Sequence, residues 1–231
     1  MTRICTICAR GGSKGVPNKN LREVAGEPLV AHSVRHALDA GIFDVVAVSS
    51  DSAAILDAAR RFGAQELVER PAELASDMAP KVPAIRHAVR TVEERRGVRF
   101  ETCCDLDATA PLRSAEEVRQ AVQLLETRGV KNVFSVVPAR RSPYFNLVEV
   151  GADGVARLSK RLDKPVFRRQ DAPACFDMNA SIYVWRRAAL DEADTVFLED
   201  TAAYVMGHRS AFDIDDEVDL KIVELLLRER T

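Results

Sequence analysis

The residues best suited to chemistry lie in a glycine-rich, basic loop near the start of the 231-residue chain, A-R-G-G-S-K-G-V-P-N-K-N over 9–20. The loop follows an apolar run, R-I-C-T-I-C over 3–8, which predicts a buried strand. Glycines allow the backbone to turn its N–H groups inward, and the other side chains add a hydroxyl and positive charge. A strand that leads into such a loop is suited to binding a polyphosphate. The residues that we expect to contribute are Arg10, Gly11, Gly12, Ser13, Lys14, Gly15 and Lys19.

Two better-known phosphate-binding patterns do not fit this loop. No Gly-Lys-Ser/Thr closes it, so it is not the G-x-x-x-x-G-K-[ST] loop. It also lacks a G-x-G-x-x-G that leads directly into a helix, which disfavours dinucleotide binding and an oxidoreductase. The alternative that the residues leave open is a basic turn facing solvent.

A second candidate site lies near the other end of the chain, in A-F-D-I-D-D-E-V-D-L. Asp213 and Asp215 are two residues apart in a strand-like segment, so both carboxylates project from the same face. Paired carboxylates can hold Mg²⁺, which would also bind a triphosphate. The competing interpretation is that Asp215 or Asp216 caps a final helix over 216–228. Both interpretations stay open for neighbouring aspartates.

The composition limits the classes of partner. Apolar residues make up 47 % and charged residues 29 %, as in soluble globular proteins, and the net charge of −2 does not suit bulk binding of nucleic acid. No apolar run approaches the roughly 20 residues that span a membrane, and the first residues lack the apolar core of a secretory signal. The five cysteines are odd in number and lie in apolar runs, so we expect buried free thiols. These observations predict a cytoplasmic protein with no nucleic-acid or membrane partner.

Short apolar runs alternate with longer amphipathic ones along the chain. This rhythm predicts a Rossmann-like, three-layer α/β/α fold with a mostly parallel sheet, in which ligands bind beyond the carboxyl ends of the strands. In the final helix, Val218, Ile222, Leu225 and Leu226 fall on one stripe, which we expect to face the core. The predicted strands are 3–8, 44–49, 102–107, 131–137 and 181–185, and the predicted helices are 28–40, 52–61, 82–95, 115–127 and 216–228.

The sequence changes character after residue 138. Asp153-Gly154 is a hairpin signal between the strand-like runs 144–150 and 155–158, and a basic, proline-punctuated stretch follows. We therefore predict a nucleotide-binding α/β domain formed by 1–138 and 181–231, with 139–180 as a small β-rich extension.

Four segments together resemble the acylneuraminate cytidylyltransferases over almost the whole chain. They are the loop over 9–20, R-P-A-E-L-A-S-D over 70–77, P-L-R over 111–113, and F-D-I-D-D-E-V-D-L. Enzymes of this family have the fold of the nucleotide-diphospho-sugar transferases and activate nine-carbon keto-sugar acids of the sialic acid type as CMP-sugars. The segments D-L-D-A-T-A-P-L-R, P-A-R-R-S-P-Y-F-N-L-V-E and C-F-D-M-N-A-S-I-Y are most similar to the branch that makes CMP-legionaminic acid.

The resemblance implies a reaction and a set of site residues. The anomeric hydroxyl of the sugar acid would attack the α-phosphorus of CTP and displace pyrophosphate, with Mg²⁺ as cofactor, in surface glycan or glycoprotein biosynthesis. It also implies a homodimer in which the extension reaches over the neighbouring subunit. By position it assigns Arg10, Ser13, Lys14, Lys19 and Asn20 to the nucleotide loop, Arg70 to the cytidine, Asp213 and Asp215 to the metal, and Asn179, Tyr183 and Arg169 to the sugar.

Two departures from the family pattern concern the sugar. Asp107 stands where the family usually has glutamine; it could take a proton from the attacking hydroxyl, accept a hydrogen bond from a sugar substituent, or simply bind backbone N–H groups of its own loop. Phe145 stands where a lysine is linked to the sugar carboxylate, so that role would pass to Arg140 or Arg141. Both changes favour a less polar nonulosonic acid such as N,N'-diacetyllegionaminic acid. The alternatives are the N-acetylneuraminate, pseudaminate or Kdo enzyme, and a noncatalytic nucleotide-binding module.

Overall fold

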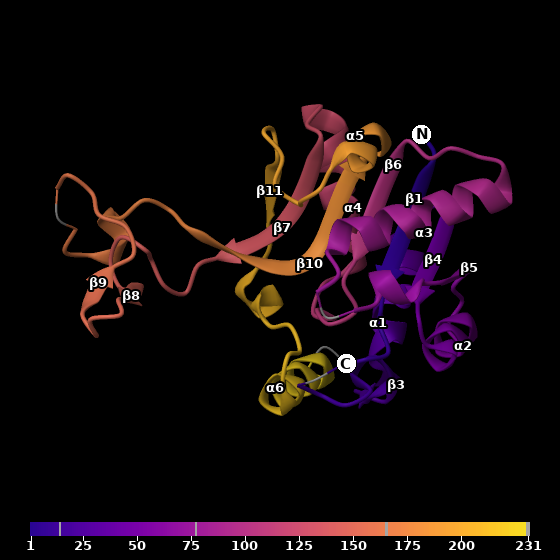
Figure 1. Cartoon of the computed structure of the whole chain (residues 1–231), viewed down its shortest axis with the longest axis horizontal. Helices are drawn as coiled ribbons and strands as arrows, with labels where there is room; N and C mark the ends of the chain where they lie inside the picture. Colours follow the sequence, from indigo (N-terminus) through magenta and orange to yellow (C-terminus); the bar gives the residue numbers. More distant parts are fainter. Residues whose placement is uncertain (14, 77, 165, 230–231) are drawn as a thin grey trace.

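The computed structural model describes residues 1–13, 15–76, 78–164 and 166–229. Within these residues the chain forms a seven-stranded sheet with the strand order β11-β7-β10-β6-β1-β4-β5 (Figure 1). Every neighbouring pair is parallel except the two that involve β10, which runs antiparallel to both β6 and β7. The strands are β1 (Arg3–Cys8), β4 (Val45–Ser50), β5 (Glu66–Glu69), β6 (Thr102–Leu106), β7 (Asn132–Pro138), β10 (Phe176–Arg186) and β11 (Ala202–Val205).

Helices cover both faces of the sheet, as the sequence predicted. The helices are α1 (Leu29–Ala40), α2 (Ala53–Arg61), α3 (Lys81–Arg96), α4 (Ala115–Arg128), α5 (Arg187–Glu192) and α6 (Glu217–Arg228). Apolar side chains of α1, α2 and α4 pack on one face, and those of α3 and α5 pack on the other. Gly41 and Gly129 follow the last residues of α1 and α4 and end these helices. Their φ values of 65° and 72° suit glycine. The three-layer α/β/α fold is confirmed.

The central strands are buried on both faces because helices cover each side. Cys5 and Cys104 point into the cluster beneath α1 and α4, whereas Ile4 and Cys103 point into the cluster beneath α3. All four side chains are fully buried, and these cysteines are free thiols. The alternation of faces along a strand accounts for the divergence of neighbouring cysteines. Cys8 departs from the expectation, because it is only partly buried at the strand end.

The strand β10 is longer than the predicted run over 181–185. It begins at Phe176, opposite Pro138 of β7, and its pairing with β7 shifts register between Met178 and Tyr183. Ala180, inside this irregular stretch, has a φ of 51°, which is unusual for a residue with a side chain. The sheet strand therefore starts within the segment that the sequence assigned to the extension.

The final helix contacts the body through a face that only partly matches the predicted stripe. Leu220 and Val223 are buried against a small apolar cluster that includes Val16, and Leu226 of the predicted stripe packs against the same cluster. Val218 and Leu225 are instead 62 % and 61 % exposed. The prediction was wrong for these two residues because α6 packs on a small cluster beside the basic loop, whose position fixes which side of the helix is covered.

The segment over 139–180 carries the short hairpin of β8 (Val148–Val150) and β9 (Ala156–Leu158), which lies well away from the sheet (Figure 1). A second short pair, β2 (Glu23–Val24) and β3 (Glu27–Pro28), follows the basic loop. The division of the chain into two domains stays a prediction. Among the described helices, none combines the length and apolar character that crossing a membrane would require.

Candidate active site

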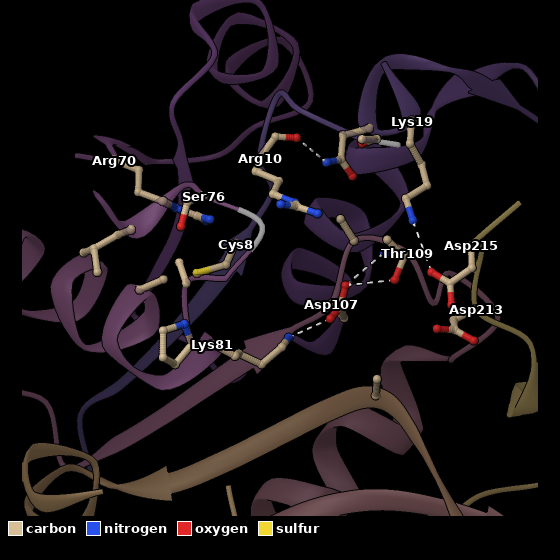
Figure 2. A pocket seen from close by; sticks show the side chains of 18 of the residues that line it. Cys8, Arg10, Lys19, Arg70, Ser76, Lys81, Asp107, Thr109, Asp213 and Asp215 are labelled. Atoms are coloured by element: carbon tan, nitrogen blue, oxygen red, sulfur yellow. Dashed lines mark hydrogen bonds and ion pairs between the residues drawn. The ribbon is translucent and has the colours of Figure 1, made fainter. Parts of the chain in front are cut away.

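A cleft of about 470 Å³ opens at the carboxyl ends of β1, β5 and β6 (Figure 2). Most of its lining comes from the loop over 9–20, the connection from β5 to α3 with the start of that helix, the residues after β6, and the segment that precedes α6. Cys8 of β1 and Ala180 of β10 complete it. This is the edge of the sheet where α/β proteins bind ligands. Of the sequence-predicted nucleotide, metal and sugar residues, Arg10, Ser13, Lys19, Asn20, Arg70, Asp107, Asp213 and Asp215 line the cleft.

Hydrogen bonds from neighbouring elements fix the basic loop. Gly11 donates its backbone N–H to Asp51 Oδ1 at 2.8 Å, and Asn20 donates its Nδ2 to the Arg10 carbonyl at 2.9 Å. Asp51 follows β4, so two adjacent strand ends are joined here. Lys14 lies outside the described residues, and Gly12 is not among the residues that line the cleft.

Gly15 has a specific steric role in this arrangement. A Cβ atom at this position would overlap the backbone carbonyl oxygen of Asp215. The basic loop and the acidic segment therefore meet backbone to backbone, which only glycine allows. This contact brings together residues that are about two hundred positions apart in the sequence.

Two cations of the cleft are held by neighbouring groups. The Lys19 ammonium donates to the carbonyl of Ile214 and lies 3.5 Å from Asp215 Oδ1. The Arg70 guanidinium is largely buried, and donates to the carbonyl of Ser49 at 2.8 Å and to its Oγ at 3.2 Å. These contacts hold positive charge on opposite sides of the cleft (Figure 2).

In the acidic segment, the aspartate that caps the helix is distinct from the aspartates that face the cleft. Asp216 caps α6, accepting hydrogen bonds from the backbone N–H groups of Val218 and Asp219 at 2.7 and 3.0 Å. Asp213 and Asp215 are therefore left to face the cleft. Burial, and then the negative charge of Asp215, raise the pKa of Asp213 above its usual range. Such a pair would be stabilised by a cation.

A buried ion-pair cluster forms the opposite wall. Lys81 Nζ lies 2.6 Å from Asp107 Oδ2 and 3.3 Å from Asp105 Oδ2. Thr109 donates its backbone N–H and its hydroxyl to Asp107 Oδ1. Burial alone would raise the pKa of Asp107, but Lys81 and Thr109 lower it below the usual range. Asp107 is thus held as a carboxylate.

The comparisons with known proteins agree with this geometry. A family model described as cytidylyltransferase matches residues 4–226. The chain belongs to the cytidylyltransferase family. It is 44 % identical over 224 residues to CMP-N,N'-diacetyllegionaminic acid synthase of Campylobacter jejuni, covering 97 % of this chain and 94 % of the relative. It is 43 % identical over 227 residues to the post-translational flagellin modification protein B of Campylobacter coli, covering 98 % and 95 %.

More distant relatives extend the same relationship. An N-acylneuraminate cytidylyltransferase of Oncorhynchus mykiss is 33 % identical over 222 residues, which make up 94 % of this chain and 48 % of that protein. A solved structure of CMP:2-keto-3-deoxy-manno-octonic acid synthetase complexed with CTP superimposes with a TM-score of 0.73 at 18 % identity, covering all of both chains. The present chain is therefore a CTP-utilising nucleotidyltransferase with the nucleotide-sugar transferase fold.

In this cytidylyltransferase, two residues predicted to bind the sugar do not line the cleft. Tyr183 is 2 % exposed, stacks on Trp185 and lies beneath the Lys81 ammonium, so it supports the wall from behind. Asn179 accepts a hydrogen bond from Ser135 Oγ at 2.7 Å and donates to the Ser210 carbonyl at 2.8 Å, so it joins β10 to β7 and to the segment that follows β11.

Arg169 lies in a separate cavity of about 550 Å³ at the base of the extension. It donates a hydrogen bond to the carbonyl of Ala139, and Arg141 and Phe176 line the same cavity. The structure therefore does not bring Arg169 or Arg141 to the cleft of their own chain.

Sequence reasoning missed several residues of the cleft, chiefly Lys81, Thr109 and Cys8. Lys81 stands one residue before the predicted helix over 82–95, in a segment that had no assigned role. Its position in the sequence could have indicated a role, because Lys81 begins the helix that follows a parallel strand, at the edge of the sheet where ligands bind. Thr109 lies two residues after Asp107, a spacing typical of a local hydrogen bond that supports an aspartate.

Proposed function

We propose that this cytidylyltransferase transfers CMP from CTP to the anomeric hydroxyl of a nonulosonic acid, most specifically N,N'-diacetyllegionaminic acid, in surface glycan or glycoprotein biosynthesis. The observation that carries the proposal is the 44 % identity, over 97 % of the chain, to a relative named as the synthase of CMP-N,N'-diacetyllegionaminic acid. The cleft supports it, because a basic loop, paired carboxylates and a polar wall meet in one place.

The basic side of the cleft suits the nucleotide. Arg10, Ser13 and Lys19 offer charged and hydroxyl donors to the phosphates, and Asn20 holds the loop through its bond to Arg10. Arg70 stands across the cleft, fixed by Ser49, where it suits the cytidine portion. Preorganised donors of this kind stabilise the charge that develops during phosphoryl transfer.

The residues present fit a magnesium ion. Asp213 and Asp215 would hold it, because both face the cleft and their mutual repulsion favours a cation between them. Bound Mg²⁺ would neutralise charge on the phosphate oxygens. Lys19, which contacts the same segment, adds a fixed positive charge beside them.

In the proposed reaction, a bond forms between the anomeric oxygen of the sugar acid and the α-phosphorus of CTP. The bond from that phosphorus to the bridging oxygen breaks, pyrophosphate leaves, and the proton of the attacking hydroxyl passes to solvent water. Little covalent chemistry falls to the protein, so its side chains act by positioning and by charge neutralisation. A carboxylate with a lowered pKa is a weak proton acceptor, so Asp107 suits a hydrogen-bonding role toward the sugar better than that of a general base.

The proposal is tested by a substrate panel with the purified full chain. CTP and Mg²⁺ are supplied with N,N'-diacetyllegionaminic, N-acetylneuraminic, pseudaminic or Kdo acid, while pyrophosphate release and CMP-sugar formation are measured. We expect the highest kcat/KM with the legionaminic acid. Preference for another sugar acid would overturn the specific substrate, and no turnover with any of them would favour the noncatalytic nucleotide-binding module.

The extension supports a homodimer in the same proposal. Its exposed apolar side chains include Val150 at 66 % and Phe167 at 81 %, an unusual exposure for such residues. A second copy that covers this surface would also bring Arg169 and Arg141 to a partner instead of to their own cleft. Light scattering should give about twice the 25.5 kDa mass of the chain, whereas a monomer mass would contradict the dimer.

A further inference from the structure

Lys81 lies on the wall of the cleft with its side chain directed at Asp107 (Figure 2), and three side chains surround its ammonium. Its ammonium contacts Asp107 at 2.6 Å and Asp105 at 3.3 Å, and lies 4.5 Å from the centre of the Tyr183 ring. These partners come from β6, the residue that follows it, and β10, so the ammonium is fixed to the rigid sheet. These contacts hold the Lys81 ammonium in one position, although lysine side chains are usually flexible.

Lys81 and Asp107 are the members of this cluster that line the cleft. Asp105 and Asp107 accept two of the three ammonium protons, and the Tyr183 ring covers a third side of the ammonium. Asp107 Oδ1 accepts from Thr109 twice, whereas Oδ2 accepts, among the described residues, from Lys81 alone. The Lys81 side chain is 28 % exposed. A ligand in the cleft can therefore reach the Lys81 ammonium and a lone pair of Asp107 Oδ2, which lie on adjacent atoms.

The charges around Lys81 bear on what can bind there. The Lys81 ammonium contacts two carboxylates, and the buried guanidinium of Arg113 interacts with the same two carboxylates. An anion placed against Lys81 would also lie beside Asp107 and be repelled by it. The cations of Arg10 and Lys19, which lie elsewhere in the cleft, suit anions better. A neutral group therefore suits the position beside Lys81 and Asp107 better than an anion does.

The geometry narrows the neutral group further. Lys81 Nζ and Asp107 Oδ2 are 2.6 Å apart, so one ligand atom can contact both. A hydroxyl oxygen accepts from the ammonium and donates its own proton to the carboxylate. A secondary amide cannot do this with one atom, because its planar trans form points N–H and C=O in opposite directions.

We propose that Lys81 is a substrate-contacting residue that, together with Asp107, binds a hydroxyl of the sugar acid and so contributes to specificity. This inference rests on the proposed function and adds a residue to it. The competing explanation is purely structural: Lys81 would only neutralise two buried carboxylates. The two explanations differ because a structural role lowers stability without distinguishing between sugar substrates.

The test compares Lys81→Met with Lys221→Met, a matched control at an exposed position of α6. KM for the sugar acid, KM for CTP, and CTP affinity without sugar are measured, together with the melting temperature. For Lys81→Met we expect KM for the sugar acid to rise about 10- to 100-fold, as for loss of a charged hydrogen bond. CTP affinity should stay within about threefold, since the nucleotide contacts other residues.

A panel of monodeoxy analogues of the sugar acid identifies the contact. With the parent enzyme, removal of the contacted hydroxyl should lower kcat/KM about tenfold or more. With Lys81→Met, the kcat/KM for the same analogue should be close to that for the complete sugar acid, because the partner of the hydroxyl is already absent. Lys81→Met leaves buried carboxylates unpaired and could fail to fold for that reason. In that case Asp107→Asn takes its place, and we again expect similar kcat/KM values for the analogue and the complete sugar acid.

Several results would overturn the inference. One is a fall in CTP affinity equal to the rise in KM for the sugar. Another is that removing the hydroxyl lowers kcat/KM as much in both variants as in the parent enzyme. A third is that none of the deoxy analogues lowers kcat/KM with the parent enzyme. If the parent enzyme uses no nonulosonic acid, the proposed function and this inference fail together. An active parent with an equally active Lys81→Met removes this inference alone.

Discussion

Replacing Gly15 with alanine should separate the two halves of the cleft. The added Cβ would lie inside 3.0 Å of the carbonyl oxygen of Asp215 and 3.2 Å from its carbonyl carbon. Because the obstacle is backbone, it cannot rotate away as a side chain would. The basic loop and the acidic segment must move apart by roughly 1 Å, which is enough to cost about 100-fold in a reaction that depends on positioning.

This prediction is checked by measuring kcat/KM for CTP from pyrophosphate release, with parallel unfolding curves. The control is Gly207→Ala, a loop glycine with a φ of −70° whose added methyl would meet nothing within 4 Å. We expect Gly15→Ala to lose about 100-fold in kcat/KM with little loss of stability, and the control to match the parent. Activity of Gly15→Ala within threefold or so of the parent would show that the close approach at Asp215 is not needed for catalysis.

Three further predictions follow from contacts of the described residues. Lys19→Ala should raise KM for CTP about tenfold or more with every sugar acid, because it removes a charged donor beside Asp215; an effect confined to one sugar would contradict this role. Asp213→Asn should raise the Mg²⁺ concentration needed for half-maximal activity, and an unchanged magnesium titration would exclude it as a ligand. Asp191→Asn should lower the free energy of unfolding by about 1 kcal/mol at pH 7, since Arg187 and Arg90 outweigh the effect of burial and lower the pKa of Asp191. A carboxylate with a lowered folded pKa stabilises above its unfolded value of about 4, so this difference should shrink as the pH falls below 4 in denaturant titrations.

The order of strands in the sheet could not be predicted from the sequence. Helical and strand periodicity located β1, β4, α1 and α4 within a residue or two, because each pattern is local. The pattern of apolar residues in a strand does not indicate its direction. The sequence therefore could not predict that β10 lies between β6 and β7 and runs antiparallel to both. The four-residue edge strands β5 and β11 were missed, because short, partly exposed strands have weak patterns.

More of the residues predicted for the nucleotide than of those predicted for the sugar line the cleft. The basic loop is contiguous, so its composition and its place after a strand are visible in the sequence. The polar wall is assembled from Lys81, Asp107 and Thr109, and its key contact joins the start of a helix to the end of a different strand. Asn179 and Tyr183 are buried and do not line the cleft, and a sequence motif does not show whether a side chain faces a cleft or the core.

By itself, the sequence determined the central strands, most of the helices, the basic loop and the family, because each depends on residue types at short spacing. Only the tertiary structure decided that Gly15 touches Asp215, that Asp216 caps α6 while Asp213 faces the cleft, and that Lys81 joins two carboxylates. These contacts link distant parts of the chain, and they form only when burial of the sheet on both faces fixes the strand ends side by side.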